Sequence, residues 1–226
     1  MSLRPSALPK LALCACYKSD PNPGPAAGRG TSLDTRFRVR IQGLPEPEDG
    51  FQPTEADDDA VEWAVATARA LAGGTPIITN EDDCRVAIPG IENPGTADAI
   101  LPERLAHADL KTGQKRNYRE QMAAYALGLM EQHFASEWTA HLLFCDQKEV
   151  VTNRFTFDEA RQIVEAVVRK FLDPDKQPSV NEYCGWCLDR ESCPARLAEA
   201  AKAIAVAESG FQFELVLADN DRLGKF

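Results

Sequence analysis

The chain has 226 residues, of which 44% are hydrophobic and 27% charged, and its formal net charge is −10 at pH 7. This length suffices to bury a substantial core, and the composition is that of an ordinary globular protein. No apolar run reaches the length of a membrane span, and the first residues lack a basic-then-apolar leader, so we expect a cytoplasmic protein without a membrane partner. The acidic charge argues against indiscriminate binding to nucleic acid.

The N-terminal part is predicted to hold short helices separated by irregular segments. Prolines make residues 21–25 an extended or irregular piece. A helix that contains Asp34 is predicted to begin after it, with Thr31 or Ser32 as its N-cap. Residues 43–60 resemble a loop, and their acidic run is interpreted as the start of the next helix, where the helix dipole favours negative charge.

Hydrophobic periodicity then predicts alternating helices and strands. Helices are expected at residues 60–71, 118–134, 157–171 and 196–208. Strands are expected at residues 96–101, 106–111, 138–145 and 150–157, and residues 77–89 are expected to form one strand or two short ones. This order predicts an α/β fold in which a central mixed β-sheet is flanked by helices. A single domain is expected over residues 1–208, and the tail 209–226 is left unplaced.

A polar face on one predicted strand indicates a site. Strand side chains alternate, so His107, Asp109 and Lys111 share one face, whereas the alanines and Leu110 between them can pack on a core. If the preceding strand is the hairpin neighbour, Asp98 reaches the same side. Two carboxylates and an ammonium group on one patch are typical of a site that binds a divalent metal and activates water. The His107 imidazole could touch this site, but a position at the strand edge, in contact with water, is favoured.

Three motifs occur in a fixed order around this strand. They are G-T-A-D at Gly95 to Asp98, D-L-K at Asp109 to Lys111, and Q-x-x-x-Y at Gln121 to Tyr125. In this order they resemble the PD-(D/E)xK nuclease superfamily, and within it the RecB-like branch. The resemblance implies a restriction-endonuclease-like core and a Mg²⁺- or Mn²⁺-dependent deoxyribonuclease.

The resemblance also implies a role for each motif residue. Asp98 and Asp109, with the backbone carbonyl of Leu110, would hold the Mg²⁺ or Mn²⁺ ion, and Lys111 would orient or deprotonate the attacking water and offset phosphate charge. Two further residues, one helical turn apart, would line the substrate side: Gln121 and Tyr125. Many RecB-like nucleases have a metal-binding His in a G-T-x-x-H segment, where this chain has Asp34. That carboxylate either ligates the ion or is an exposed helix acid.

Cysteines near the C-terminus form a second motif, C-x₂-C-x₅-C, at Cys184, Cys187 and Cys193. Thiolates select zinc or iron–sulfur clusters. The spacing resembles the iron–sulfur branch of the RecB-like nucleases, which includes CRISPR-adaptation exonucleases and AddB-type helicase–nucleases. The resemblance implies a [4Fe–4S] cluster completed by Cys14, with Cys16 as the alternative, that clasps residues 1–30 to residues 180–200; structural zinc is the alternative metal. The two remaining cysteines, Cys84 and Cys145, are expected to be buried apolar residues.

The function predicted from this resemblance is that of a metal-dependent DNA nuclease. An exonuclease acting on DNA ends or single strands is favoured, in phage or mobile-element recombination or in CRISPR adaptation, with a protein partner from such a pathway. The alternative is a cluster-stabilised nucleic-acid-binding or assembly module with a degenerate nuclease site, and a zinc-bound scaffold is a third possibility. Basic residues that favour a DNA substrate form two groups in the sequence: Lys111, Lys115, Arg116 and Arg119, and Arg29, Arg36, Arg38 and Arg40.

Overall fold

A computed structural model describes residues 3–19 and 24–208 of the protein. The chain divides into two compact units, which we describe separately. The sheet unit comprises residues 1–9 and 25–168, and the cysteine unit comprises residues 10–24 and 169–226. The predicted tail, residues 209–226, lies outside the described residues, and the single-domain organisation of residues 1–208 stays a prediction.

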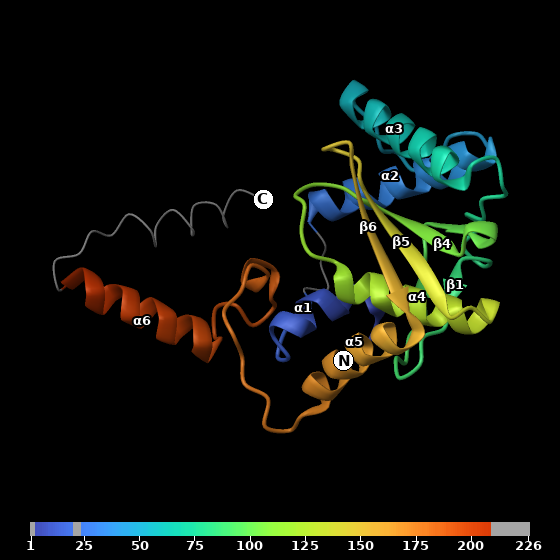
Figure 1. The fold of residues 1–226 in the computed structure, drawn as a ribbon. Coiled ribbons are helices and arrows are strands. Elements are labelled where there is room, and N and C mark those ends of the chain that lie inside the picture. Colours follow the sequence, from blue (N-terminus) through green and yellow to red (C-terminus); the bar gives the residue numbers. More distant parts are fainter. Residues whose placement is uncertain (1–2, 20–23, 209–226) are drawn as a thin grey trace. The chain divides into compact units, whose positions relative to one another are not determined.

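The sheet unit is built on a four-stranded mixed sheet with helices on both faces, as the sequence predicts (Figure 1). Its strands, in the order in which they pair, are β3 (Ala99–Leu101), β4 (Ala106–Lys111), β5 (Glu137–Phe144) and β6 (Glu149–Thr156). The outer pairs β3–β4 and β5–β6 are antiparallel, whereas β4 and β5 are parallel. A parallel pair needs a crossover connection, and helix α4 (Arg119–His133) supplies it.

Of the two alternatives for residues 77–89, the single continuous strand is wrong. Only β1 (Arg85–Val86) forms there; it pairs with β2 (Gly95–Thr96), and Ile78 makes an isolated bridge to Ile100. Residues 80–83 form a turn in which the Asn80 side chain accepts a hydrogen bond from the Asp82 amide. A run of Asn and acidic residues favours such a turn over strand pairing.

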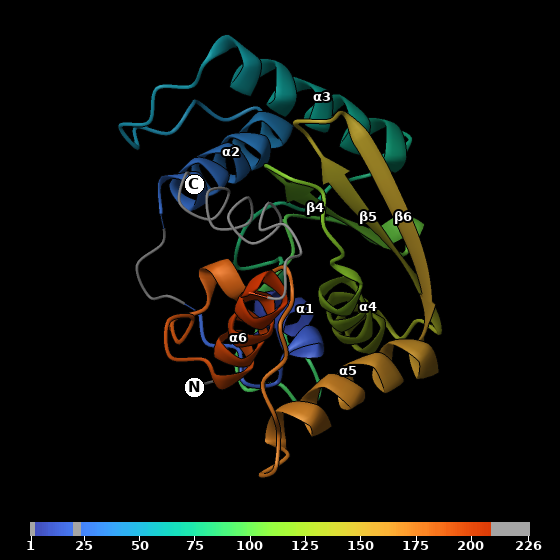
Figure 2. The ribbon, with the colours of Figure 1, turned by 90° about the vertical axis from the view of Figure 1, so that its left-hand side faces the viewer.

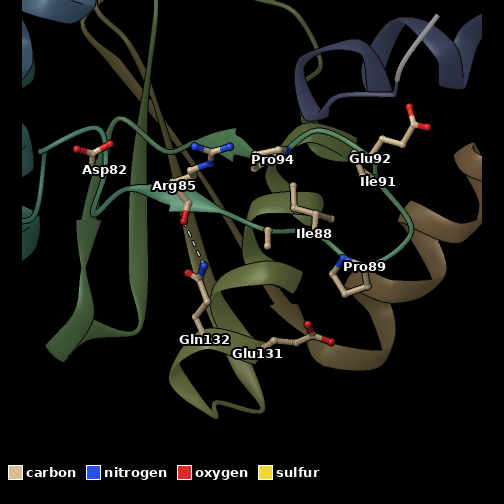
Figure 3. A pocket seen from close by; sticks show the side chains of 10 residues that line it. Asp82, Arg85, Ile88, Pro89, Ile91, Glu92, Pro94, Glu131 and Gln132 are labelled. Carbon is tan, nitrogen blue, oxygen red and sulfur yellow. Dashed lines mark hydrogen bonds between the residues drawn. The ribbon is translucent and has the colours of Figure 1, made fainter.

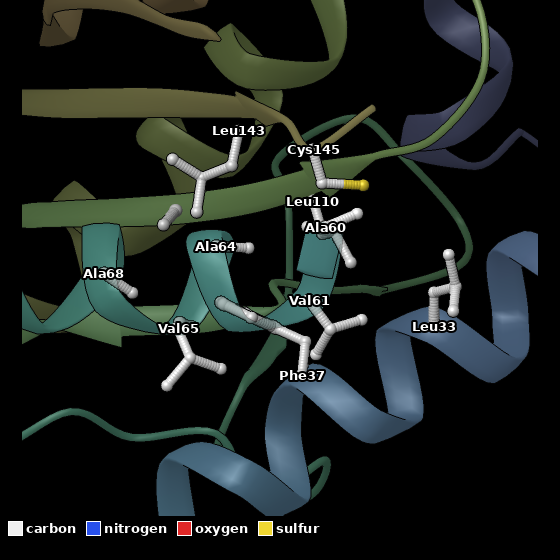
Figure 4. Packing of buried hydrophobic residues seen from close by; sticks show 12 residues of the cluster. Leu33, Phe37, Ala60, Val61, Ala64, Val65, Ala68, Leu110, Leu143 and Cys145 are labelled. Carbon is white, nitrogen blue, oxygen red and sulfur yellow. The ribbon is translucent and has the colours of Figure 1, made fainter. Parts of the chain in front are cut away.

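Helices α2 (Pro25–Gln42) and α3 (Glu55–Ala72) pack on one face of the sheet (Figures 2 and 4). Their apolar side chains meet the apolar face of β4 in a cluster that includes Phe37, Val61, Ala108 and Leu110. Ala108 and Leu110 therefore pack on a core, as predicted. The expected start of α2 is wrong, since the helix begins at Pro25 and encloses Thr31 and Ser32; proline suits a first helical position because it has no amide hydrogen to leave unpaired.

The acidic run Asp57 to Asp59 lies near the start of α3, as predicted, but the helix begins at Glu55 and the expected start at residue 60 is wrong. Thr54 and Asp57 form a capping box, and Gly73 ends the helix in the left-handed conformation.

On the opposite face of the sheet, α4 is buried from Gln121 to Met130 and packs mainly on β5. Helix α5 (Phe157–Leu172) follows β6. Across residues 3–19 and 24–208, no helix combines the length and apolar character that a membrane crossing requires.

The cysteine unit pairs two segments that are far apart in the sequence. It contains most of α1 (Leu8–Leu13), the short helix η3 (Cys184–Trp186) and α6 (Pro194–Glu208). Residues after α1 bond to the loop around η3: the Tyr17 hydroxyl donates to the Trp186 carbonyl at 3.0 Å, and the Leu188 amide donates to the Lys18 carbonyl at 2.8 Å. An isolated antiparallel bridge joins Ser19 to Cys187.

Gly95, the first residue of the G-T-A-D motif, allows α4 to approach the β2 strand closely. A Cβ atom at this position would lie 2.3 Å from Tyr125 Cε1 and 2.8 Å from Pro5 Cγ. Such distances are far below van der Waals contact, so a side chain here would push Tyr125 out of place. Tyr125, which faces the predicted site, can therefore keep its position only because residue 95 has no side chain.

We expect Gly95→Ala to lower the free energy of unfolding by about 1–3 kcal/mol, the usual cost of overpacking a core. Gly28→Ala is the control, because a Cβ atom there meets nothing within 4 Å and the residue lies inside α2. Alanine at that position should leave stability unchanged or raise it by about 0.5–1 kcal/mol. Urea unfolding of both variants measures the difference, and equal stabilities would contradict the packing role of Gly95.

Candidate active site

The structure brings the two predicted acids together across neighbouring strands. Asp98 lies in the link between β2 and β3, and its Oδ2 atom accepts a hydrogen bond from the Leu110 amide at 2.7 Å. Asp109 lies on β4, is almost fully buried, and forms an ion pair through Oδ2 with Lys111 Nζ. Lys111 Nζ also lies 4.8 Å from the centre of the Tyr118 ring. The hairpin geometry that the sequence predicts thus places both carboxylates beside one amine.

The Leu110 backbone faces the same edge of β4 as Asp98. On the other edge, the Lys111 carbonyl accepts a hydrogen bond from the Cys145 amide at 3.1 Å. In a strand the N–H and C=O of one residue point to the same edge and successive residues alternate between the two edges, so the Leu110 N–H and C=O both point toward the β3 side. The carbonyl that the sequence analysis assigns to a metal therefore lies at the edge where Asp98 binds.

Asp34 joins this cluster through an arginine that the sequence analysis did not assign to the site. Arg38, one turn further along α2, binds both Asp34 oxygens through Nε at 3.0 and 3.2 Å and binds Asp98 Oδ1 through Nη2 at 2.7 Å. Arg38 also donates to the carbonyls of Thr79 and Ala97, and only 7% of its surface is exposed. Of the two alternatives for Asp34, the exposed helix acid is wrong, because its carboxylate faces the cluster.

Burial governs the protonation of these groups. Burial raises the pKa of Asp98 to about 7, with the Asp34 charge adding to the rise, and raises the pKa of Asp109 to about 6. It also raises the pKa of Asp34. Burial acts in the opposite direction on Lys111, but Asp109 and Asp98 outweigh it and raise the Lys111 pKa above its ordinary value. The Lys111 amine is therefore charged at neutral pH, whereas the pKa values of Asp98 and Asp109 lie close to neutral pH.

Gln121 and Tyr125 lie on one face of α4 and are almost fully buried. Gln121 Nε2 donates to the Tyr125 hydroxyl at 3.5 Å, and burial raises the Tyr125 pKa above its ordinary value, with both site acids adding to the rise.

The favoured position of His107, at a strand edge in contact with water, is wrong: the imidazole has no exposed surface, and its Nδ1 accepts a hydrogen bond from Trp138 Nε1 at 3.1 Å. It packs edge-on to Tyr125, 5.8 Å between ring centres.

The side chains of this cluster suit a hard cation. They offer three carboxylates and a carbonyl, which are the oxygen ligands that Mg²⁺ and Mn²⁺ prefer. Asp109 Oδ2 is buried and, despite the Lys111 ion pair, lacks a well-directed hydrogen bond. Throughout the part of the chain that is described, however, no three His, Cys, Asp or Glu side chains are arranged closely enough to bind a metal ion as they stand. In this cluster, Arg38 and Lys111 engage the carboxylates instead.

The early group of arginines is engaged in ion pairs within the sheet unit. All four pair with acids of the sheet unit: Arg29 with Asp57 and Asp146, Arg36 with Asp49, Arg38 with Asp34 and Asp98, and Arg40 with Glu46, Asp58 and Glu62. Of the group beside the site, Lys115 and Arg119 pair with Glu149 and Glu159 but remain about half exposed. These two side chains can exchange an exposed carboxylate for a phosphate at low cost.

In the cysteine unit, the predicted ligands from both ends of the chain lie near one another. Burial raises the pKa of Cys16, and the neighbouring Cys14 and Cys193 thiols add to the rise. Backbone amides point at two of the sulfur atoms: Ser179 N lies 3.5 Å from Cys14 Sγ, and Asn181 N lies 3.3 Å from Cys184 Sγ. Cys84 and Cys145 are fully buried, as predicted.

A hollow of about 850 Å³ lies elsewhere in the sheet unit (Figure 3). Acidic, basic and apolar residues mix along it, including Asp82, Arg85, Ile88 and Glu131. None of the predicted site residues lines this hollow, and the Gln132 side chain spans part of it by donating to the Arg85 carbonyl at 3.2 Å. The buried acids, not this hollow, are therefore the candidate active site.

Comparison with known proteins agrees with this assignment at the level of a family. Residues 94–194, a little less than half of the chain, match the family described as the PD-(D/E)XK nuclease superfamily. Members of that superfamily are metal-dependent nucleases, and the match supports an enzyme of this kind. The matched segment contains Asp98, Asp109 and Lys111, and the α/β architecture is consistent with the fold of the superfamily.

Two further comparisons add little. A search among curated proteins finds no match. A solved structure titled "Crystal structure of SSO0001" is similar to this chain at 16% identity, with a TM-score of 0.34, covering 74% of this chain and 85% of that one.

The raised pKa of Asp98 predicts a specific dependence of stability on pH. A carboxyl group whose folded pKa is raised stabilises the fold below its unfolded pKa, and this contribution is lost as the pH rises toward the folded pKa. Relative to Asp98→Asn, whose side chain is always neutral, the unmodified protein should lose up to about 1.4 kcal/mol per pH unit between about pH 4 and 7.

Urea unfolding from pH 4 to 8, in the presence of a chelator, measures this difference. Asp83→Asn, in the exposed turn before β1, serves as the control and should follow the unmodified protein at every pH. A constant difference between Asp98→Asn and the unmodified protein across this range would show that Asp98 is not shifted.

Proposed function

We propose that the protein is a metal-dependent DNA nuclease whose active site is the buried cluster of acids in the sheet unit. The observation that carries the proposal is the convergence of Asp34, Asp98 and Asp109 with the Lys111 amine from three separate parts of the chain. Asp98, Asp109 and Lys111 lie within residues 94–194, which match a nuclease family. The Mg²⁺ or Mn²⁺ ion would be held by these acids and the Leu110 carbonyl. When bound, it supplies a nucleophilic water at neutral pH and neutralises charge on the phosphate.

The residues around the ion then have distinct tasks. Lys111 is held protonated by its acidic neighbours, so it donates hydrogen bonds to the attacking water and offsets phosphate charge without removing a proton. Tyr125, buried behind both acids, keeps its hydroxyl proton, and Gln121 orients that hydroxyl. Because both side chains are buried, we assign them to positioning the acids from behind.

A narrow substrate footprint fits the charge of the protein. The net charge of −10 repels DNA over most of the surface, whereas the half-exposed Lys115 and Arg119 flank the site. Such a site suits DNA ends or single strands better than a long duplex. We therefore favour an exonuclease, of the kind used in phage or mobile-element recombination or in CRISPR adaptation, with a protein partner that supplies further DNA contacts.

Asp109→Asn should lower Mg²⁺- or Mn²⁺-dependent cleavage of end-labelled DNA by at least about a hundredfold, because a lost ligand removes several kcal/mol of charge stabilisation. Lys111→Met should lower the cleavage rate while metal binding persists. Matched controls are Asp83→Asn and Lys148→Met, since Lys148 pairs with Asp59 outside the site, and both should keep cleavage unchanged. Cleavage that survives Asp109→Asn would place the active site elsewhere.

The same experiment decides between this function and a second candidate, a nucleic-acid-binding or assembly module with a degenerate nuclease site. That candidate is favoured by one observation, namely that Arg38 already engages two of the three acids. Single- and double-stranded substrates should both be tested. Binding of DNA without metal-stimulated cleavage, by the unmodified chain as by Asp109→Asn, supports the binding module.

We further propose that Cys184, Cys187 and Cys193 hold a [4Fe–4S] cluster with Cys14, and that this cluster clasps the two ends of the cysteine unit. The amides that point at the Cys14 and Cys184 sulfur atoms support it, since amides stabilise bound thiolates, and the Ser179 backbone contacts both of these sulfur atoms. The cluster would have a structural task, because it would fasten together two segments that the bridge between Ser19 and Cys187 already pairs.

Protein purified without air should be brown and contain iron and sulfide. Cys184→Ser and Cys14→Ser should abolish the visible absorption, whereas Cys84→Ala, outside the cysteine unit, should keep it. Cys16→Ser tests the alternative ligand. A colourless protein that contains stoichiometric zinc would replace iron–sulfur by structural zinc, and a protein without either metal would overturn the clasp.

A further inference from the structure

Arg38 is the most completely bonded side chain of the site. All three nitrogens of its guanidinium group donate to the chain: Nε to Asp34, Nη1 to the Thr79 and Ala97 carbonyls, and Nη2 to Asp98. Arginine remains charged at any pH the protein experiences. A permanent positive charge is therefore buried between two acids of the candidate active site.

These contacts use the oxygens that a divalent ion would need. Asp98 Oδ1 binds Arg38, Asp98 Oδ2 binds the Leu110 amide, and both Asp34 oxygens lie within hydrogen-bond distance of Arg38 Nε. The five charged side chains of the cluster are three carboxylates and two cations. A divalent ion added to all five would give an excess of buried positive charge, which is as unfavourable as an excess of negative charge.

We propose that Arg38 is the resident counter-cation of the metal-free site and that a divalent ion binds by displacing its guanidinium group from the acids. This inference rests on the proposed function, since it concerns the same site. In the metal-free protein, Arg38 holds Asp34 and Asp98 in place and limits their repulsion. In the metal-bound protein, the ion takes over that task, so Arg38 sets how much metal is needed to occupy the site.

The test is calorimetric titration of the chelator-treated 226-residue chain with MnCl₂. Arg38→Gln removes the competing charge but keeps a polar side chain, so it should bind Mn²⁺ about tenfold more tightly, equivalent to about 1.4 kcal/mol. Arg40→Gln is the matched control, because Arg40 lies on the same helix but pairs with Glu46, Asp58 and Glu62 outside the site, and its affinity should be unchanged. Unchanged or weaker Mn²⁺ binding by Arg38→Gln overturns the proposal.

Removing Arg38 also leaves the buried acids uncompensated, so Arg38→Gln is expected to melt at a lower temperature in chelator. Mn²⁺ should then raise its melting temperature by more than it raises that of the unmodified protein or of Arg40→Gln. If the variant does not fold in chelator, Mn²⁺ should restore its cooperative melting transition, and a failure to do so contradicts the proposal.

Failure of this inference can be told apart from failure of the proposed function. Mn²⁺ binding by the unmodified chain, with no gain in Arg38→Gln, contradicts only the role of Arg38. An unmodified chain that takes up no Mn²⁺ contradicts both.

Discussion

The cost of burying charge shapes the sheet unit. Asp109 is almost fully buried and the Asp98 side chain is only 13% exposed, and a carboxylate so removed from water is tolerated only when it is paired or neutral. Arg38 and Lys111 pair with them, and these bonds run from α2 through the link before β3 to β4. The pairing therefore joins the helical layer to the sheet at the point where the candidate active site lies. A fold without these acids would need neither cation.

The cost of burying charge also explains how the apolar side chains of the sheet unit are arranged. β4 presents alanines and Leu110 to α2 and α3, and it presents Asp109 and Lys111 to the side of α4. Small residues on the apolar face let the helices approach, and Gly95 does the same for Tyr125 on the other face. Packing on both faces excludes water from the acids, and this exclusion raises their pKa values toward neutrality. Core packing and acid–base chemistry are thus set by the same contacts.

The acidity of the chain has a structural use. The four early arginines are consumed in pairs with acids of the sheet unit, so they contribute little positive field at the surface. Close to the candidate active site, the half-exposed side chains Lys115 and Arg119 near the start of α4 offer positive charge to a phosphate backbone. A protein built in this way depends on its metal site, or on a partner, for most of its attraction to nucleic acid.

Local sequence determined much of this molecule. Alternation on β4 identified which side chains face the core, and the order of the G-T-A-D, D-L-K and Q-x-x-x-Y motifs indicated the family that residues 94–194 match. The bounds of α4, α5 and α6 were predicted within a few residues, whereas the starts of α2 and α3 were predicted too late and the strands within residues 77–89 are shorter than expected. These misses fall where proline, a capping box or a turn sets the end of an element, and hydrophobic periodicity gives no signal there.

Only the tertiary structure decided how the charges pair. Asp34 and Arg38 are one helical turn apart, a spacing visible in the sequence, but Arg38 also bonds to Asp98, which lies 60 residues further along the chain. The burial of His107 against Trp138 is likewise a contact between neighbouring parallel strands. Sequence patterns report which face a side chain takes within its own element. The partner on another element, and the loss of water that shifts a pKa, exist only once the elements have packed.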